Sequence, residues 1–499
     1  MANGKRRVAV IGTGPAGVIA TDALVKEQAF DTIRVFERQH IAGGTWVLTR
    51  GESRHIPSLP GLLKNQGHLP LELPSKFPFK TPKAEETNFQ KPWYSDTAAY
   101  EHLHSNLPPD IMSFTQEPIP KVVSERTLAK YGPNSPFRHR EVIRGWVEGI
   151  LKRDGNDGLV EFTTDVELAE KKGDEWVLTL RKTTLGVSTD HWWQERFDAV
   201  IVATGHYYVP HVPDIPGLQR FPGRVKHTKH YQTAEEFKGK RVLVVGGSVS
   251  AFDALHDIRL VSKHPIISSM QNPEPTFGWA PFTHPGIDNR PPISAVDPQT
   301  GRITFTDDTF ISDVDVVLFA TGYDFSFPFL PNVKAVNQRV PGLYQHVFKI
   351  SDPSLAFIGM VTGGFGMRIF EWQAVAAARV LTGHATLPTK KDMEDWEQNR
   401  VSKCGDGPLF WALAPDFEEH FEALRAIAGE PAPGTTGRVL PKYDPKWEEI
   451  LWQFVDDRIR WWKEEETKAE AERAVDFMAI ISNAPPPGQY ASDKHQQGV

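Results

Sequence analysis

The sequence predicts an α/β fold with two Rossmann-like dinucleotide-binding domains, one inserted into the other, and a helical C-terminal extension. Three observations support it: a Gly-rich turn after a short apolar strand near the N-terminus, a second such turn near residue 246, and two similar apolar strands that bracket the second turn. We therefore place the outer domain at 1–209 and 325–400 and the inner domain at 210–324. The helical extension is placed at 401–483 and a disordered tail at 484–499.

The first Gly-rich turn follows the apolar run 8–11 and precedes a stretch with the pattern of a helix. It matches G-x-G-x-x-G, in which each glycine has a physical reason. Gly12 makes the tight turn, Gly14 lets the backbone approach a pyrophosphate, and Gly17 lets the helix lie close to the strand. The pyrophosphate is expected at the helix N-terminus, where free N–H groups and the helix dipole favour an anion.

Glu37 ends the second predicted strand, about 20 residues after Gly17, where an acid binds a pair of ribose hydroxyls. The segment 41–46 follows closely, and its two glycines allow the backbone to pass near a ligand. Trp46 adds a flat apolar face at the same place. The first turn is therefore predicted to bind a dinucleotide, although the turn alone does not distinguish NAD from FAD.

The second Gly-rich turn, residues 246–251, follows the predicted strand 242–245 and opens the predicted helix 248–260. Ser248 replaces the middle glycine and Ala251 the helix-packing glycine, so the fingerprint is a modified one. The strands at 198–205 and 315–322 both end in Ala-Thr-Gly, a small turn where a chain can pass from one domain to another. Two such turns in one chain predict two bound dinucleotides.

Composition narrows the classes of function. The formal net charge of −7 over 499 residues argues against general nucleic-acid binding, which needs a basic face. The single cysteine, Cys404, excludes an internal disulfide and a paired-cysteine redox centre. The apolar runs are shorter than the roughly 18 residues of a membrane span, and the first strand starts too early for a cleaved signal peptide. We expect a cytoplasmic protein with no transmembrane anchor and no metal site.

Over most of its length the chain resembles the flavin-containing monooxygenases. The stretch 221–231 carries that family's fingerprint F-x-G-x-x-x-H-x-x-x-Y, with Phe221, Gly223, His227 and Tyr231 at the defined positions. The match extends to the first turn, Glu37, the Gly-Gly-Thr-Trp segment, the inserted second turn, and the stretches 100–114, 319–330, 355–360 and 370–381.

The resemblance implies that FAD lies on the outer domain and a nicotinamide cofactor on the inner one, NADPH by family, with NADH left open. It implies that the nicotinamide reduces the flavin, that oxygen then forms a hydroperoxyflavin, and that one oxygen atom passes to a nucleophilic nitrogen or sulfur. The oxidised nicotinamide stays bound and shields the intermediate from solvent. The expected substrate is a small amine, thiol or thioether, and a homodimer stays open.

The resemblance also implies the residues of the site. Asn106 matches the family's active-site asparagine beside the flavin, where an amide donates and accepts hydrogen bonds without adding charge. Gln373 matches a flavin-contacting residue, with an exposed helical glutamine as the alternative, and Val166 would meet the adenine through its backbone. The predicted cofactor-binding residues are Gly12, Gly14, Pro15, Ala16, Gly17, Glu37, Arg38, Gly44, Thr45, Trp46, Ser105, Asn106, Leu107, Val166, Thr204, His227, Gly246, Ser248, Ser250, Ala251 and Gln373.

The sequence departs from an NADPH site at one place. Such sites usually have an arginine just past the second strand of the unit, where it binds the 2′-phosphate. Here residues 266–272 contain no basic residue. Ser269 and Gln271 are candidates to bond a phosphate or a bare ribose, and Lys229 or Arg290 to supply the charge. The local residues therefore predict a weakened preference for NADPH.

Three further stretches carry expectations. The insert 273–292, rich in proline and aromatic residues, is expected to be a packed surface loop, with a substrate mouth lined by Phe277, Trp279, Phe282 and His284 as the alternative. The stretch 51–93 is expected to wrap the outer domain or gate the site. Residues 444–478 have the pattern of an amphipathic helix whose apolar stripe is expected to dock on the body, with a dimer contact or a membrane surface as the alternatives. The stripe comprises Trp447, Ile450, Leu451, Phe454, Ile459 and Trp462.

Three other functions are weighed against nitrogen or sulfur oxygenation. A Baeyer–Villiger monooxygenase, which inserts oxygen beside a ketone, has a similar fingerprint with Trp where Tyr231 stands, so Tyr231 favours nitrogen and sulfur. An uncoupled NAD(P)H oxidase would reduce oxygen without an organic product. A non-catalytic dinucleotide-binding regulator would be purified without flavin colour.

Overall fold

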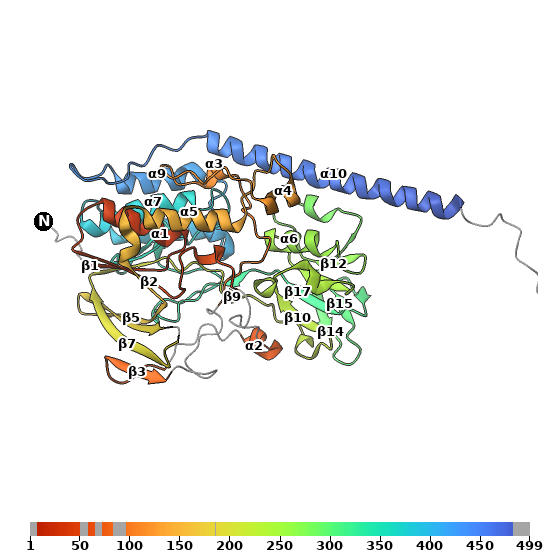
Figure 1. Ribbon diagram of the computed structural model, residues 1–499, viewed down its shortest axis with the longest axis horizontal. Helices are drawn as coiled ribbons and strands as arrows, with labels where there is room; N and C mark the ends of the chain where they lie inside the picture. Colours follow the sequence, from red (N-terminus) through yellow and green to blue (C-terminus); the bar gives the residue numbers. More distant parts are fainter. Residues whose placement is uncertain (1–6, 50–57, 65–71, 83–95, 185, 483–499) are drawn as a thin grey trace, which may run out of the picture.

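The computed structural model describes residues 7–49, 58–64, 72–82, 96–184 and 186–482, with side-chain surroundings described as far as residue 472. Most of the stretch expected to wrap the outer domain, and the tail expected to be disordered, lie outside these residues. Figure 1 shows two α/β bodies side by side and a long helix that runs past both. Among the described helices, none is both long and apolar enough to cross a membrane.

The first body is built on a seven-stranded sheet in the order β19-β20-β21-β8-β1-β2-β4. Its five central and adjacent strands, from β21 to β4, pair in parallel. The strands are β1 (Arg7–Ile11), β2 (Thr32–Glu37), β4 (Val160–Phe162), β8 (Ala199–Val202), β19 (Leu343–Tyr344), β20 (Phe348–Lys349) and β21 (Leu355–Phe357). Strands β1 and β8 are apolar and buried on both faces, as expected of parallel strands covered by other layers.

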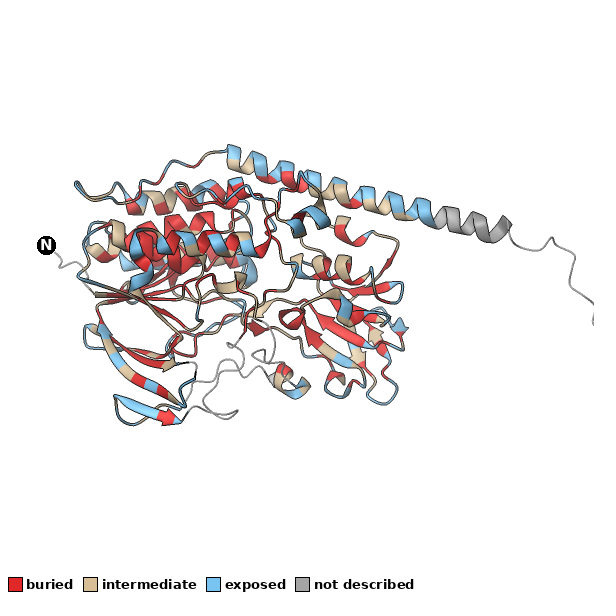
Figure 2. Cartoon of the chain, in the orientation of Figure 1, coloured by how far each residue is buried: buried red, intermediate tan, exposed pale blue. Residues whose placement is uncertain are grey.

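Helices cover one face of this sheet and a second sheet lies beyond the other (Figure 1). The helices are α1 (Pro15–Lys26), α5 (Arg140–Lys152), α7 (Arg368–Thr382) and α9 (Phe417–Ala428). The second sheet is antiparallel, in the order β3-β7-β6-β5, with β3 (Phe79–Pro82), β5 (Thr164–Lys172), β6 (Glu175–Thr183) and β7 (Thr189–Phe197). In Figure 2 the buried colour is continuous through α1 and α7, which lie in the middle of the core.

The second body contains a five-stranded, fully parallel sheet in the order β10-β17-β11-β12-β13. The strands are β10 (Arg224–His227), β11 (Val242–Val245), β12 (Ile266–Ser269), β13 (Ile287–Arg290) and β17 (Val316–Phe319). Helix α6 (Val249–Ile258) follows β11, and a small antiparallel sheet adds β14 (Ile293–Val296), β15 (Ile303–Phe305) and β16 (Phe310–Ile311). Two parallel sheets, each with a helix after its Gly-rich turn, confirm the predicted fold class.

The chain passes between the bodies at two neighbouring points. Strand β9 (Val209–Pro210) leaves the first body and β18 (Tyr323–Asp324) returns to it, and the two strands pair antiparallel. The predicted boundaries near 209 and 324 fall on this pair of strands. Their assignment as domain limits stays a prediction.

The C-terminal region is helical. It contains α8 (Lys390–Cys404), α9 and α10 (Lys446–Ser482), while the shorter helices α2 (Leu59–Lys64), α3 (Pro109–Met112) and α4 (Glu125–Tyr131) lie elsewhere. Leu451 of α10 belongs to the core of the first body and Trp462 to the core of the second. The apolar stripe predicted for this helix therefore docks on the protein, and it contacts both bodies.

Candidate active site

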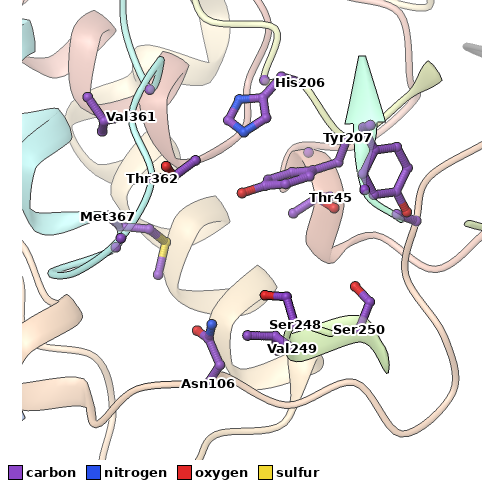
Figure 3. A pocket seen from close by; sticks show the side chains of 18 of the residues that line it. Thr45, Asn106, His206, Tyr207, Ser248, Val249, Ser250, Val361, Thr362 and Met367 are labelled. Carbon is purple, nitrogen blue, oxygen red and sulfur yellow. The ribbon is translucent and has the colours of Figure 1, made fainter. Parts of the chain in front are cut away.

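A cavity of about 1330 Å³ lies between the two bodies. Both Gly-rich turns open into it, and so do both strand ends with the sequence Ala-Thr-Gly. In Figure 3, Asn106 and Ser248 lie on one side of this space and His206 and Tyr207 on the other. Its size exceeds that of a usual single-ligand pocket, and it is large enough for two dinucleotides to meet.

The first turn is shaped by close backbone contacts. Gly12 has φ +105°, and a Cβ there would lie 2.6 Å from the carbonyl oxygen of Ala203. A Cβ at Gly17 would overlap the carbonyl oxygen of Gly12. Glycine at these positions lets α1 pack directly against the turn, which leaves its N-terminus open to the cavity.

Glu37 closes the first turn from the side. One carboxylate oxygen accepts hydrogen bonds from the backbone N–H of Thr13 at 2.8 Å and from its hydroxyl at 2.7 Å. The other oxygen accepts from the backbone N–H of Gln39 at 2.8 Å. Glu37 is 5% exposed and borders the cavity. The carboxylate therefore orders the turn and still faces the place where a ribose is expected.

The Gly-Gly-Thr-Trp segment packs onto the first turn. The backbone N–H of Gly43 donates to the carbonyl of Thr13 at 3.0 Å. Gly44 approaches so closely that a Cβ there would lie 2.8 Å from the Cα of Gly14. Thr45 and Trp46 then extend along the cavity wall. The predicted role of these two glycines, close passage of the backbone near a ligand site, has a direct steric basis.

The second turn repeats the geometry with different neighbours. Gly246 has φ +142°, and a Cβ there would overlap the carbonyl of Ala320, the counterpart of Ala203. A Cβ at Gly247 would lie 2.5 Å from the carbonyl oxygen of Asn272. Ser248, the N-cap residue of α6, and Ser250 are both exposed to the cavity side. This helix N-terminus offers N–H groups to an anion, as the first one does.

Asn106 lies in a loop that is fixed by its neighbour. The hydroxyl of Ser105 donates to the carbonyl of Leu107 at 3.1 Å and accepts from the N–H of Arg138 at 3.0 Å. The backbone N–H of Ser105 donates to the carbonyl of Arg138 at 2.8 Å. Ser105 is buried whereas Asn106 is exposed and points into the cavity (Figure 3). The amide of Asn106 is thus presented on a rigid support between the two turns.

His206 and Tyr207 follow the first Ala-Thr-Gly end. Their rings are 4.3 Å apart, and His206 also contacts Phe325 at 4.9 Å. Neither ring nitrogen of His206 has a hydrogen-bond partner among the described residues. Burial lowers the pKa of His206 to about 4, so the imidazole is neutral at physiological pH. The sequence analysis did not predict that these two residues face the cavity.

Seventeen of the 21 predicted cofactor-binding residues line the cavity. Gly17 and Ala251 do not; both lie where a helix packs against its turn, and Ala251 is fully buried. The remaining two, His227 and Gln373, are fully buried and also lie off the cavity wall. Contact of the lining residues with a cofactor stays a prediction.

Gln373 does not line the cavity but holds a residue that does. Its side-chain oxygen accepts a hydrogen bond from the backbone N–H of Gly359 at 2.9 Å, and Gly359 lines the cavity. The alternative of an exposed helical glutamine is wrong, because the side chain is 0% exposed inside α7. The side chain holds Gly359 in place, and its predicted contact with a flavin stays a prediction.

His227 lies at the junction between the bodies. Its Nδ1 accepts from the backbone N–H of Lys229 at 3.0 Å, and its ring packs against Tyr323 of β18 at 5.1 Å. Tyr323 in turn lines the cavity. His227 therefore reaches the cavity wall through Tyr323, and its predicted contact with a cofactor stays a prediction, while a place at the link between the bodies agrees with the position of the fingerprint.

Lys229 is not a phosphate ligand. It is 0% exposed, it forms an ion pair with Asp96 at 3.1 Å, and its ammonium donates to the carbonyl of Tyr208 at 2.8 Å. Arg290 pairs with Asp288 at 2.8 Å and does not line the cavity. Ser269 is buried and donates to the carbonyl of Pro291. Lys229, Arg290 and Ser269 therefore have other partners, whereas Gln271 is exposed just past β12 and stays a candidate.

The proline- and aromatic-rich insert 273–292 fits the expected packed surface loop over most of its length and the alternative, a substrate mouth, only at its start. Phe277 lines the cavity together with residues 273–276. Phe282 is buried in the core of the second body, and Trp279 is 51% exposed. Neither Trp279, Phe282 nor His284 borders the cavity. Most of the insert is thus a packed surface loop, and only its first part reaches the site.

Helix α10 supplies a wall that sequence reasoning missed. Leu451, Trp452, Phe454, Val455 and Arg458 all line the cavity. Their apolar spacing indicated a docked face, but not the surface on which it docks. The one unusual signal was Arg458, a charged residue at the border of that stripe.

The residues present fit two dinucleotides. Each Gly-rich turn forms a cradle that any Cβ would fill, and each opens onto a helix N-terminus suited to a pyrophosphate. Glu37 stands at the ribose position of the first, and Trp46, Val166 and Met367 offer apolar surface along the wall. The first site would hold the flavin dinucleotide and the second the nicotinamide dinucleotide.

Comparisons with known proteins agree with this geometry. The family profile described as "FMO-like: Flavin-binding monooxygenase-like" matches residues 132–273 and 292–406. The flavin-containing monooxygenase ustF2 of Aspergillus flavus is 27% identical over 89% of this chain and 96% of its own length. The flavin-containing monooxygenase FMO GS-OX5 of Arabidopsis thaliana is 32% identical over 78% of this chain and 76% of its own.

A further relative and a solved structure extend the match. The trimethylamine monooxygenase of a Roseovarius species is 28% identical over 80% of each chain. The structure of S-allyl-L-cysteine S-oxygenase from Allium sativum has a TM-score of 0.70 over 95% of this chain and 99% of its own, with 23% identity. At that identity the structural match supports the fold. The chain is an oxidoreductase that belongs to the flavin-binding monooxygenase-like family, whose members use FAD and NADPH.

Proposed function

We propose that this chain transfers one oxygen atom from O2 to the nitrogen or sulfur of a small amine, thiol or thioether, using FAD and NADPH. The observation that carries the proposal is that both Gly-rich turns and Asn106 open into one cavity. A second support is the related trimethylamine monooxygenase, whose name states an amine substrate. Bound flavin supplies the chemistry, because when reduced it activates oxygen for transfer to a nucleophile.

The protein's own residues bind the two cofactors, orient the reacting groups and protect them from water. The turn at Gly12 and the carboxylate of Glu37 fix one dinucleotide, and the turn at Gly246 presents the other across the cavity. Asn106 stands between them, with an amide that can donate to an oxygen and accept from an N–H at once. Ser105 holds that amide in place. Positioning of this kind is where a protein adds most to a cofactor reaction.

The uncharged part of the cavity wall at His206 protects the reactive oxygen species from reaction with water. His206 is uncharged at physiological pH because burial lowers its pKa to about 4. Tyr207, Met367 and Phe370 add aromatic and apolar surface around it. A wall of this kind keeps bulk water and stray protons away from a reactive oxygen species.

The test is a product assay with the flavin-loaded protein. NADPH and NADH are each supplied with ¹⁸O₂ and a panel containing a tertiary amine, a thiol, a thioether and a ketone. We expect one labelled oxygen in an N-oxide or sulfoxide, with product formed nearly in step with NADPH consumed. Ester from the ketone without sulfoxide, or hydrogen peroxide as the sole product, would contradict the proposal.

Asn106→Ala is the matched variant. We expect the ratio of product to NADPH consumed to fall at least about fivefold, because one positioned hydrogen bond to a reacting group is typically worth 1 kcal/mol or more. Flavin content should be unchanged, since the turn at Gly12 is intact. Asn289→Ala is the control, because that amide donates to the carbonyl of Phe282 away from the cavity.

A further inference from the structure

Arg458 of α10 lines the cavity, and its guanidinium is surrounded by aromatic side chains. Its guanidinium lies over the rings of four residues at 4.6–5.7 Å from the ring centres, with the side chain half-buried. The four rings belong to Tyr131, Phe137, Trp461 and Trp462. No described residue forms a hydrogen bond or an ion pair with this guanidinium.

Three other described arginines have carboxylate partners. Arg460, two residues along α10, is bound to Asp457 at 3.0 Å, and Arg259 of α6 is bound to Glu465 at 2.9 Å. The buried Arg438 contacts three carboxylates. Removing a cation from water is unfavourable unless a partner offsets it, and aromatic faces offset only part of the loss. Arg458 therefore stands ready for an anion that enters the cavity.

Arg458 is close to the proposed reaction centre. Leu107, the neighbour of Asn106, packs in one cluster with Phe137, Phe454 and Val455. Phe137 is one of the four rings under the guanidinium, and Phe454 lies one helical turn before Arg458 on α10. The cation thus borders the part of the cavity reached by Asn106.

An acidic residue across the cavity from this cation already has another partner. Asp253 of α6 lines the cavity and accepts a hydrogen bond from the Tyr100 hydroxyl at 3.2 Å. Burial raises the pKa of Asp253, and the positive charges of Lys130 and, to a smaller extent, Arg458 oppose that rise. The diphosphate of the nicotinamide cofactor already has the turn at Gly246 and the N-terminus of α6. The 2′-phosphate of NADPH is expected just past β12, near Gln271. Neither expectation places an anion at Arg458, so a substrate's acid group is the candidate.

We propose that Arg458 binds the carboxylate of the substrate, so that this chain oxygenates the sulfur or nitrogen of a small molecule that also carries an acid group. The inference rests on the proposed oxygenase function and names the substrate class of the same site. The planar fork of arginine suits a carboxylate through two parallel hydrogen bonds. The aromatic rings around it hold the fork at a fixed angle and add apolar surface for the substrate's chain.

The experiment compares an acid with its own ester. The probes are 3-(methylthio)propanoate and its methyl ester, which share the thioether and differ in charge. For the wild-type holoenzyme we expect a kcat/KM at least about tenfold higher for the acid, because a charge-assisted hydrogen bond is worth about 1.5–3 kcal/mol. Direct binding of the acid to the oxidised enzyme, measured by isothermal titration, gives a second readout that needs no turnover.

Arg458→Gln should raise KM and the dissociation constant for the acid about 10- to 100-fold and leave the ester unchanged. Arg460→Gln is the matched control on the same helix, since that side chain is 63% exposed and outside the cavity, and it should change neither. Arg458→Lys, which keeps the charge and most of the stem, should show a smaller loss for the acid. This variant serves if the glutamine variant loses its flavin.

Two outcomes overturn the inference and differ from failure of the function itself. Equal values for acid and ester in the wild type, with normal sulfoxide formation, would remove the subsite and leave the oxygenase. A rise in the KM for NADPH in Arg458→Gln, without a change for the acid, would assign the cation to the cofactor's diphosphate. Absence of sulfoxide from both probes and of any other oxygenated product would overturn the function and the subsite together.

Discussion

The two Gly-rich turns share one design and differ in what surrounds them. In each, the first glycine lies against the carbonyl of an alanine from an Ala-Thr-Gly end, Ala203 in one and Ala320 in the other. Around the first turn a buried carboxylate, Glu37, and a crossing glycine, Gly44, close the site. Around the second turn the two serines at the helix start are exposed, and β12 ends in the buried Ser269 without a carboxylate.

This difference indicates different relations to the ligand. A turn enclosed by a carboxylate and a second backbone segment is built to keep its dinucleotide. A turn whose helix N-terminus is exposed is built to exchange it. We infer that the first site retains the flavin through many turnovers whereas the second binds and releases the nicotinamide, and four changes would break or sharpen this contrast.

The largest expected effect comes from exchanging the helix-packing residues. Gly17→Ala puts a Cβ onto the carbonyl oxygen of Gly12, so α1 must move away from the turn. We expect the absorbance of bound flavin per protein to fall at least about tenfold. Ala251→Gly in the second unit removes a methyl group from a helix that already accommodates it, and should destabilise by only about 1 kcal/mol. Similar flavin loss in both variants would mean that the loss reflects general destabilisation and not the steric fit at the first turn.

Glu37→Gln should weaken flavin retention next. The amide keeps one acceptor, but its NH₂ group must face either Thr13 or Gln39, both of which donate to this side chain. We expect the dissociation constant for FAD, measured by fluorescence of released flavin, to rise about 10- to 100-fold. Glu161→Gln on β4, which pairs with Arg34 outside the cavity, is the control and should retain flavin normally.

Acid should destabilise the protein through its buried histidines. Burial lowers the pKa of His227 to about 3, whereas an unfolded histidine titrates near pH 6.5. The unfolded state therefore binds a proton first, so this contribution is full above pH 6.5 and is lost as the pH falls from 6.5 toward 3. The loss reaches at most about 1.4 kcal/mol per pH unit for each such group.

His227→Asn isolates this contribution, because asparagine can still accept from the N–H of Lys229. The change in urea midpoint between pH 7.5 and 5.0 should be smaller in this variant than in the wild type. His206→Asn, at the exit of the first unit, should reduce the pH dependence by a similar amount over this range, since its native pKa of about 4 also lies below pH 5.0. An unchanged pH dependence in His227→Asn would show that this imidazole does not limit acid stability.

The smallest effect is expected at the open ribose end of the second site. Gln271 is exposed just past β12, where an arginine binds the 2′-phosphate in NADPH-specific sites. Gln271→Arg should lower the KM for NADPH about 3- to 10-fold and leave that for NADH nearly unchanged, because only one cofactor carries the phosphate. Gln299→Arg, in an exposed turn elsewhere in this body, is the control. Equal gains for both cofactors would indicate a general charge effect.

What the sequence predicted well is local. The turns, Glu37 and the Gly-Gly-Thr-Trp segment depend on contacts between a strand end and the residues around it, and a missing side chain at Gly12 or Gly17 is visible in the sequence itself. The loop of Asn106 came from family resemblance and not from physics, since an asparagine before two prolines is an ordinary turn.

What it missed depends on distant partners. Lys229 had the charge for a phosphate, but Asp96 pairs with it after folding. Gln373 had the pattern of an exposed helical residue until Gly359 met it in the core. The amphipathic pattern of α10 showed an apolar face, yet which surface it covers is decided by Phe137, Phe252 and Phe277, far away in the chain. The spacing of apolar residues therefore predicts the buried face of a helix but not the surface against which that face packs.

Helix α10 also sets an order of events during synthesis. Both Gly-rich turns and Asn106 precede residue 360 in the chain, but the cavity wall also includes Met367 and Phe370, so this side of the cavity also needs the start of α7. The cavity lacks one wall until residues 451–462 follow. A nascent or C-terminally truncated chain would therefore have a cofactor cavity that is open to solvent on the side of α10. Helix α10 therefore closes the cavity late in the chain, and a protein that ends before residue 451 lacks this wall.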